Sequence, residues 1–598
     1  MNPYQHGQSA QAAGSGLRRS GVHGLFRLDE GPIDPDDAVR LGLDAVRSGA
    51  GILEAFDPVE PWAGTSAVED ACTTCLAGWI DDAAMIAERL GLSPGSSPAR
   101  IARAALDRYG AETPLQLSGE WTLLQWDRRA GRAAVTIMAS AARRDPVLYA
   151  QAGARLAVSS DLYALARIGW VDSELDETGL LAGMGRPAAR AMAPGRTIYR
   201  GVARLGPGQG LVFRAGASPK ALHCDPLALP PPWPGTAEEA LAEAEALLRQ
   251  IMRERIARAG SAAMLLSGGL DSTLLSWAAA TEADPASNLI TFTSAAPPGC
   301  AVRDETNEAR LVADSLGLAN LPIVVGPEHD SYRPPARVLA GANGPPLGNR
   351  HCLTEAFQQV ARQHGINLLV NGTYGEGTLT ARLEKPGPLS IIRRFAKRLL
   401  GRTEGPSLLQ AGDWFHVQLA THRLAKLPPE LAARPEPAKP DAHHGQFGFQ
   451  PVAAKALAHP NAFYAGAVRM DFPFRDLRLL RFFAGLPTGT VSSLGADRGA
   501  ARRMLAGRVP AAIVDRRAGR PADPGGYDRL QRQAPTARAR IAGYRKAGLD
   551  AWLDLDWLEL ELTRVASHGV SGVDQANRTQ LTAMTAEYLQ WLQDGAKS

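Results

Sequence analysis

The chain has 598 residues, a formal net charge of +4, and 45% hydrophobic and 21% charged residues. Because one hydrophobic core rarely serves so long a chain, we expect two or three large domains. Five cysteines are too few for a disulfide framework at this length. No run of about 18 apolar residues is present to predict a membrane span. A small net charge neither favours nor excludes nucleic acid, because a basic footprint requires clustering. We expect a cytoplasmic protein with no nucleic-acid partner.

Residues 1–22 are rich in Gln, Ser, Gly and Ala, which predicts a disordered tail. No apolar region follows Arg18-Arg19, so a signal peptide is not expected. Residues 23–224 then show short strands and polar turns, typical of an α+β domain with antiparallel sheet. The predicted elements are strands at 120–127 and 133–140, a hairpin at 146–160, and helices at 82–90 and 98–109.

Cys72 and Cys75 form a lone C-x-x-C pair. A zinc site would need a second pair of ligands at suitable spacing, and none stands out in the sequence. We therefore expect two thiols buried in a helix, in a reducing compartment.

A proline-rich segment at 225–235 predicts a domain linker, because proline cannot continue a helix or a central strand. Thr236 and Glu239 form a capping box that predicts the start of a helix, which Gly260 ends. Short apolar strands and helices then alternate, which favours a parallel sheet covered on both faces. We expect strands at 262–266, 289–293, 322–325 and 367–370 and helices at 272–281, 305–316 and 353–364.

Residues 384–446 interrupt this alternation with many prolines and a basic stretch at 390–402. We interpret the region as an insertion and the basic stretch as a solvated helix face. The remaining sequence is mostly helical in its pattern.

The stretch "MLLSGGLDS" at 264–272 predicts a phosphate-binding turn. Glycines let the backbone approach a ligand closely, and the free N–H groups of the following helix favour anions. The loop has no lysine after its glycines, so it is not a Walker P-loop. Asp271 would repel phosphate unless a cation lies between them, which makes it a candidate Mg²⁺ ligand.

The motif S-G-G-L-D-S after an apolar strand resembles the pyrophosphate loop of the ATP-pyrophosphatase superfamily. Further stretches of residues 236–520 resemble the asparagine-synthetase-like branch, in the expected order. They are Asp304-Glu305 with Ala309, "VNGTYGEG" at 370–377, "RMDFPFRDLRLLRFFAGLP" at 469–487 and "RRMLAGRVPAAIVDRR" at 502–517. This resemblance implies a parallel-sheet α/β ATP-pyrophosphatase domain with a helical C-terminal part, spanning 236–598.

The resemblance implies cleavage of ATP between its α and β phosphates, with Mg²⁺ as cofactor. It places ATP against Leu266, Ser267, Gly268, Gly269, Leu270, Asp271, Ser272, Thr293, Asn371 and Gly372. The metal ligands implied are Asp271 and Glu376, the latter in place of the family's aspartate.

A lysine that the family places after the last arginine block is missing here. Arg516, Arg517 or Arg520 could supply its positive charge, because guanidinium binds phosphate oxygens well. We prefer Arg517 and Arg520 as catalytic candidates. Tyr374 is a candidate proton relay. His351 is a further candidate near the expected cleft.

The N-terminal part resembles the glutaminase-like domain of the same family, an Ntn-type α+β sandwich. "LSGEWTLLQWD", "VLYAQAGARLAVSSD" and "PGRTIYRGVARLGPG" carry this resemblance. The family's glutaminase needs a cysteine at the mature N-terminus, whereas this chain starts Met1-Asn2 and its first cysteine is Cys72. We expect a degenerate domain that releases no ammonia and serves structure or docking.

An amine of the substrate itself would then attack the adenylate, as in the lasso-peptide cyclases, which this chain resembles most. That resemblance implies adenylation of an Asp or Glu side chain in a precursor peptide, followed by ring closure with the peptide's N-terminal amine. A leader-peptide protease and a leader-binding protein are the implied partners. The alternatives are an ammonia-dependent asparagine synthetase, a β-lactam-type synthetase and a non-catalytic scaffold.

Overall fold

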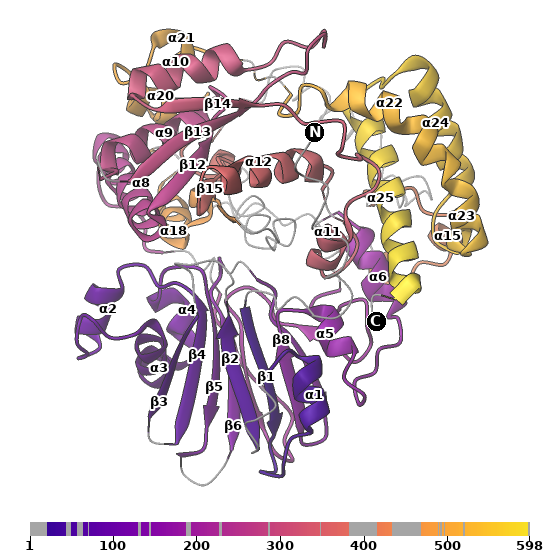
Figure 1. Cartoon of the computed structure of the whole chain (residues 1–598). Helices are drawn as coiled ribbons and strands as arrows, with labels where there is room; N and C mark the ends of the chain where they lie inside the picture. The colour runs from indigo at the N-terminus through magenta and orange to yellow at the C-terminus, as the bar shows by residue number, and fades with distance from the viewer. Residues whose placement is uncertain are drawn as a thin grey trace, which may run out of the picture.

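In the computed structural model, the chain combines two antiparallel sheets, one parallel sheet and a C-terminal group of helices (Figure 1). The structure describes residues 21–595 apart from 44–49, 57–63, 70, 130–132, 143–144, 187–192, 226–229, 285–286, 347, 382–414, 433–467, 488–489, 491–492, 496, 518 and 520. The predicted basic stretch at 390–402 and most of the predicted tail lie outside the described residues. Gly21 and Val22, which we assigned to the tail, instead begin the first strand.

Two antiparallel sheets form the centre of the N-terminal part, as the short-strand pattern predicted. The first sheet has the order β2 (Gly51–Phe56), β1 (Gly21–Arg27), β8 (Arg155–Ser159), β7 (Leu148–Ala152) and β9 (Ala203–Arg204). The second has the order β11 (Lys220–Leu222), β10 (Gly210–Arg214), β6 (Ala134–Ala139), β5 (Trp121–Asp127), β4 (Cys72–Gly78) and β3 (Thr65–Glu69). The hairpin predicted at 146–160 is the β7–β8 pair, with Ala152 opposite Arg155.

The two sheets face each other across an apolar core, so the N-terminal part is the predicted α+β sandwich. Phe26 on β1 and Trp126 on β5 meet edge to face in that core, with ring centroids 5.8 Å apart. The outer face of the second sheet is covered by α2 (Ala83–Arg89) and α3 (Pro98–Tyr109). Short elements complete this part: α1 (Pro35–Arg40), η1 (Gly110–Glu112), α4 (Thr113–Gln116), α5 (Leu162–Ala166) and α6 (Glu177–Met184).

The C-x-x-C pair lies on strand β4 and not on a helix, so that prediction was wrong. Cys72 and Cys75 are both buried, as expected. Residues three apart on a strand point to opposite faces of the sheet. The two thiols therefore cannot act as one ligand pair.

A parallel sheet follows, as the alternation of strands and helices predicted. Its order is β14 (Ala319–Ile323), β13 (Asn288–Ser294), β12 (Ser261–Leu265), β15 (Leu368–Val370) and β16 (Arg469–Asp471). β14 begins three residues earlier than predicted and contains Pro322, which its edge position tolerates. β16 was not predicted, since a three-residue strand carries too little pattern to be recognised.

Helices pack against the parallel sheet and share one hydrophobic core with it. The capping box of Thr236 and Glu239 begins the first of them, as predicted. They are α8 (Ala237–Ala259), α9 (Leu270–Glu282), α10 (Thr306–Leu316), α12 (His351–Gln363), α18 (Leu477–Gly485), α20 (Gly499–Leu505) and α21 (Ala511–Val514), with the short turns η3 (Gly375–Gly377) and η5 (Pro473–Arg475).

The C-terminal helices form a second large core with the outer face of the first antiparallel sheet. They are α22 (Gly526–Ala539), α23 (Ile541–Lys546), η6 (Leu549–Ala551), α24 (Leu555–His568) and α25 (Val573–Gly595), joined by α11 (Ala336–Gly341), α15 (Thr421–Ala425) and α16 (Pro429–Ala432). Figure 1 shows α25 lying beside α6. Phe415 and Leu431 are buried in this core, so the described middle of the predicted insertion belongs to the fold.

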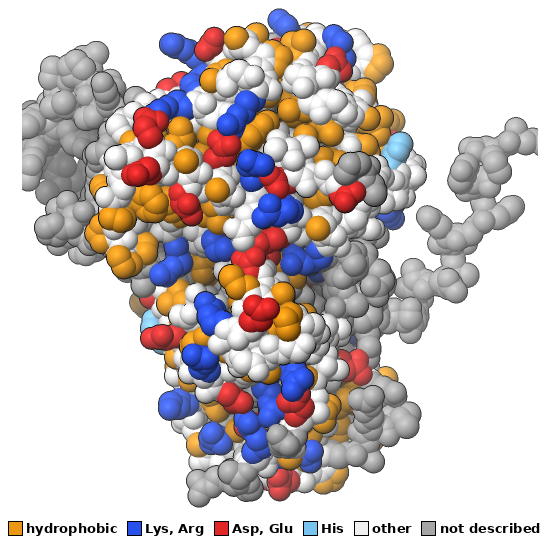
Figure 2. Space-filling view, turned by 90° about the vertical axis from the view of Figure 1, so that its left-hand side faces the viewer, with side chains coloured by type: hydrophobic (Ala, Val, Ile, Leu, Met, Phe, Trp, Pro, Cys, Tyr) orange, Lys and Arg blue, Asp and Glu red, His pale blue; other side chains and the backbone are white. Residues whose placement is uncertain are grey.

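Among the described residues, no helix combines the length and apolar character that crossing a membrane requires. Basic and acidic side chains are interspersed over the face seen in Figure 2. This mixture agrees with the small net charge of +4.

Candidate active site

The glycine loop lies at the carboxyl end of β12, in the middle of the parallel sheet, where ligands of open α/β sheets bind. Gly268 has a φ of +68°, and a Cβ there would lie 2.6 Å from the Cβ of Glu308 on α10. Only glycine meets both conditions without strain. Gly269 then forms the N-cap of α9 without a side-chain cap, which leaves the first N–H groups of the helix for a ligand.

Two hydroxyls hold the loop in shape. The Ser267 amide donates to the Ser272 hydroxyl (3.2 Å), which itself donates to the carbonyl of Gly269 (3.1 Å). The Gly269 amide donates to the Ser267 hydroxyl at 3.3 Å. These bonds close the loop on itself without any ligand. The glycine loop expected from the sequence is therefore held in one conformation by its own hydrogen bonds.

Asp271 lies in the first turn of α9 and has three polar neighbours from other segments. The Thr380 hydroxyl donates to its Oδ1, and Nη1 of Arg498 lies 3.1 Å from its Oδ2. Burial raises the pKa of Asp271, and the Glu376 carboxylate adds to the rise, whereas Thr380 and Arg498 oppose it. A Cβ at Gly375 would come within 2.1 Å of Oδ1, so this glycine allows the two loops to approach.

The second loop follows β15 and lies against the first. A Cβ at Gly372 would lie 3.0 Å from the Ser272 amide nitrogen, which shows how closely the loops pack. The Asn371 amide donates to the carbonyl of Asp471 on β16 (2.9 Å), and its side-chain oxygen accepts from the Thr373 amide (3.0 Å). Glu376 is exposed. The structure thus brings Asp271, Gly372 and Glu376 to one place.

Tyr374 is buried behind this loop and has a left-handed backbone, with φ of 78°. Its ring meets Phe472 edge to face at 5.7 Å. Burial raises the pKa of its phenol, which disfavours the phenolate form. Tyr374 is therefore close to the loop, with most of its surface in packing contacts.

Arg516 contacts the glycine loop. Its Nη1 donates to the Ser267 carbonyl (3.1 Å) and its Nη2 to Glu305 (2.6 Å). Arg517, one of our two preferred arginines, is exposed, and Arg520 lies outside the described residues. The direction of each side chain after the short helix α21 decides which of these arginines faces the site.

Two other candidates have hydrogen-bond partners outside these loops. The Thr293 hydroxyl donates to the Asn320 side chain at 2.8 Å. Thr293 is buried near the carboxyl end of β13, one residue after Phe292, which pairs with Leu265 at the end of β12. A ring nitrogen of His351 lies 2.8 Å from the Asp330 carbonyl oxygen, and burial lowers the pKa of this histidine to about 4. His351 is thus neutral near pH 7 and contacts a loop near the C-terminal helices.

Two residues of the site were missed in the sequence, Thr380 and Arg498. Both reach Asp271 across more than 100 residues of chain, and neither belongs to a local motif. Within the described ranges, no three or more His, Cys, Asp or Glu side chains gather as metal donors. The pair Asp271 and Glu376 fits Mg²⁺, which takes one or two carboxylates and completes its shell with phosphate and water.

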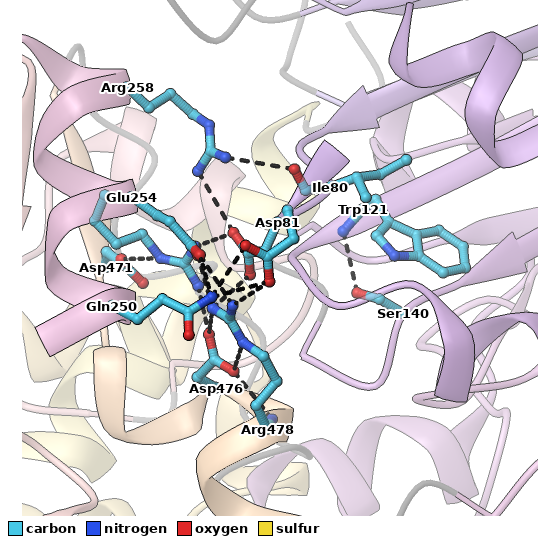
Figure 3. Close-up of polar contacts among 12 residues, drawn as sticks. Ile80, Asp81, Trp121, Ser140, Gln250, Glu254, Arg258, Asp471, Asp476 and Arg478 are labelled. Atoms are coloured by element: carbon cyan, nitrogen blue, oxygen red, sulfur yellow. Dashed lines mark hydrogen bonds and ion pairs between the residues drawn. The ribbon is translucent and has the colours of Figure 1, made fainter. Parts of the chain in front are cut away.

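A buried ion network joins the N-terminal sandwich to the parallel-sheet domain (Figure 3). Arg255 on α8 contacts Asp81 of the sandwich, Asp471 at the end of β16 (3.0 Å) and Asp476 before α18 (3.0 Å). Arg478 adds bonds to Asp82 (3.0 Å) and other members. Because Asp471 also accepts from Asn371, the network reaches the second loop of the site.

All five cysteines of the chain lie within the described residues. Cys72, Cys75, Cys224 and Cys352 are buried, and Cys300 is partly exposed. Burial raises the pKa of the Cys72, Cys224, Cys300 and Cys352 thiols, that of Cys352 to about 11. A nucleophilic cysteine requires an accessible thiol with a lowered pKa, so these thiols are unsuited to glutamine hydrolysis.

The comparisons with known proteins agree with the site. Residues 243–375 and 456–593 match the asparagine synthase family. The first matched range includes the glycine loop and ends one residue before Glu376. A comparison with curated proteins found no match.

Two solved structures are similar over 59% of this chain, each with 10% identity and a TM-score of 0.22. One is glutamine phosphoribosylpyrophosphate amidotransferase from B. subtilis in complex with ADP and GMP, of which 70% is covered. The other is described as the allosteric regulatory enzyme of purine biosynthesis, with 69% covered. TM-scores this low carry no argument about the site. The family match does, and residues 243–375 and 456–593 of this chain are thus similar to the asparagine synthase family.

Proposed function

We propose that this protein closes a lactam ring in a peptide, as the lasso-peptide cyclases do. A carboxylate oxygen of an Asp or Glu side chain attacks the α-phosphorus of ATP, and pyrophosphate leaves. The N-terminal amine of the same peptide then attacks the acyl-adenylate, loses a proton and expels AMP. One isopeptide bond forms for each ATP cleaved.

The observation that supports the proposal is a hydrogen-bonded glycine loop at a helix N-terminus, in a chain whose thiols are unsuited to releasing ammonia from glutamine. Ser267 and Ser272 shape the loop, and the free N–H groups of α9 point to phosphate. Cys72, Cys75 and Cys224, the cysteines of the sandwich, are buried. The amine must then come from another source, and the substrate itself is the simplest one.

The residues of the chain divide the work between binding and positioning. Asp271 and Glu376 would hold Mg²⁺, which supplies positive charge against the phosphates when it is bound. Arg516 fixes the carbonyl of Ser267 and so the course of the loop. Tyr374 packs behind the second loop and supports its left-handed turn. We place a precursor peptide as the substrate, and a leader-peptide protease and a leader-binding protein as partners.

The test is pyrophosphate release from ATP and Mg²⁺ with a linear peptide that has a free N-terminal amine and an internal Asp or Glu. Mass spectrometry should show a product that has lost one water. The same peptide with an acetylated amine should release pyrophosphate without forming a ring. Asparagine formation from aspartate and ammonia would overturn the proposal in favour of a synthetase. No pyrophosphate release with any carboxylate would favour a scaffold.

A variant pair links this activity to the site. Asp271→Ala should abolish pyrophosphate release and leave the thermal midpoint within a few degrees of the parent protein. Asp314→Ala is the matched control, because the Asp314 side chain is exposed on α10, where it pairs with Arg310 at 3.4 Å. Full activity of Asp271→Ala would remove the site assignment.

A further inference from the structure

Arg498 is the basic side chain that contacts the carboxylate of Asp271. Its Nη1 lies 3.1 Å from Oδ2, and the two side chains are 24% and 25% exposed. The pair is thus mostly buried. Oδ1 is taken by the Thr380 hydroxyl, so both oxygens of Asp271 have partners.

The backbone holds Arg498 in an unusual conformation that aims it at this carboxylate. Its φ is 55° and its ψ 36°, a left-handed geometry that non-glycine residues seldom adopt and that costs on the order of 1 kcal/mol. The Arg498 amide donates to the carbonyl of Ala381 (3.2 Å), next to Thr380. The same short segment therefore places both partners of Asp271.

The Arg498 guanidinium still has N–H donors available for a ligand. Its Nε is buried and has no hydrogen-bond partner in the described structure. A guanidinium carries five N–H donors and binds phosphate oxygens in a forked geometry. Arg516, by contrast, is committed to Ser267 and Glu305, and Arg517 is exposed. Arg498 is the guanidinium best placed to replace the missing lysine.

A divalent cation and a guanidinium compete for the same carboxylate oxygen. Oδ2 of Asp271 is the atom that contacts Arg498, and Asp271 is one of the two carboxylates that fit Mg²⁺. We propose that Arg498 exchanges partners during the reaction. It neutralises Asp271 while the site is without Mg²⁺-ATP, and it binds the departing pyrophosphate once Asp271 has turned to the cation. This inference rests on the ATP-dependent reaction proposed above.

The exchange predicts that removing Arg498 strengthens the binding of a divalent cation and slows the release of pyrophosphate. Arg498→Met removes the competitor, so Mn²⁺ as a probe, without ATP, should bind about threefold to tenfold more tightly, as expected for the loss of one partly exposed ion pair. The same variant should release pyrophosphate about 100-fold more slowly, because a charge-stabilising donor is lost. A residue that merely props up the loop would weaken both.

The experiment measures Mn²⁺ affinity by electron paramagnetic resonance at pH 8, and pyrophosphate release separately. Arg498→Lys keeps the charge and should keep the parent affinity for Mn²⁺ and recover part of the rate. Arg503→Met is the matched control on α20, the helix that Arg498 caps, because Arg503 pairs with Glu238 instead of Asp271. It should leave both readouts unchanged.

Unchanged or weaker Mn²⁺ binding in a folded Arg498→Met protein would overturn the exchange. So would a parent-like rate of pyrophosphate release with tighter Mn²⁺ binding. If Arg498→Met does not fold, the lysine variant decides: parent-like Mn²⁺ affinity with a partly recovered rate supports the exchange, and loss of both refutes it. The Mn²⁺ arm needs no peptide, so failure of ring closure and failure of this inference are separable.

Discussion

Glu120 offers a prediction whose magnitude follows from its surroundings. Its side chain is buried at the start of β5, and its Oε2 has no hydrogen-bond partner in the described structure. It lies between the two domains with Asp145 and Arg469 around the same small pocket. Burial, and then the charge of Asp471, raise the pKa of Glu120 from 4.5 to about 7, against the opposing charges of Arg475, Arg255 and Arg469.

The sign of the pH effect follows from this rise. Between pH 4.5 and 7 the unfolded chain loses the Glu120 proton while the folded protein keeps it, so the group's contribution to stability falls as pH rises. At about 1.4 kcal/mol per pH unit, the full loss comes to about 3 kcal/mol. Glu120→Gln has no such proton to lose.

The assay is urea unfolding of the parent protein and Glu120→Gln between pH 4.5 and 8. Tryptophan fluorescence reports locally, because Trp79 and Trp121 line the same pocket as Glu120. The free energy of unfolding of the variant, relative to the parent, should rise by about 3 kcal/mol across this range and then level off. Other titrating groups cancel in the difference.

Glu88→Gln is the matched control, because Glu88 is exposed on α2. Its free energy of unfolding should differ little from that of the parent, since the side chain lies in water in the folded protein. A pH-independent difference for Glu120→Gln would refute the reasoning. It would mean that the carboxyl is already ionised in the folded state.

Three further predictions concern the site and the domain junction. Gly268→Ala should cut the rate of pyrophosphate release at least tenfold, because the added Cβ meets α10 and the φ of +68° suits glycine alone. Steady-state kinetics check this, provided that the variant keeps the thermal stability of the parent protein. Arg516→Met should raise the KM for ATP more than it lowers kcat, since it frees the carbonyl of Ser267; parallel changes would contradict it. Asp81→Asn should lower the free energy of unfolding by about 2–4 kcal/mol, because Asp81 is a buried partner of Arg255. The Asp82 side chain is partly exposed, so Asp82→Asn should lower it by under 1 kcal/mol. Urea unfolding midpoints distinguish the two variants.

Contiguous motifs made part of the site predictable. The loop from Ser267 to Ser272 is one short stretch whose glycines and hydroxyls have local reasons to be there, and the structure places them at the carboxyl end of β12 as expected. The capping box at Thr236 is equally local. Such features depend on neighbours a few residues away, which the sequence displays directly.

Features built by distant segments were not predictable. Thr380 and Arg498 reach Asp271 only after the chain has folded, and nothing near either residue marks it. The choice among three neighbouring arginines depended on side-chain direction, which composition does not reveal. The C-x-x-C pair was assigned to a helix although Thr73 and Thr74 between the cysteines favour a strand.

The burial of α25 has a consequence for how the protein is made. Tyr163 of the sandwich and Tyr588 of α25 are buried against each other, with their hydroxyl oxygens 3.0 Å apart across 425 residues of sequence. The burial of the outer face of the first sheet is therefore completed only after this late helix has been synthesised. At roughly 5–20 residues per second, that face waits for tens of seconds on the ribosome. A nascent chain of this protein thus leaves part of this apolar face exposed over that time.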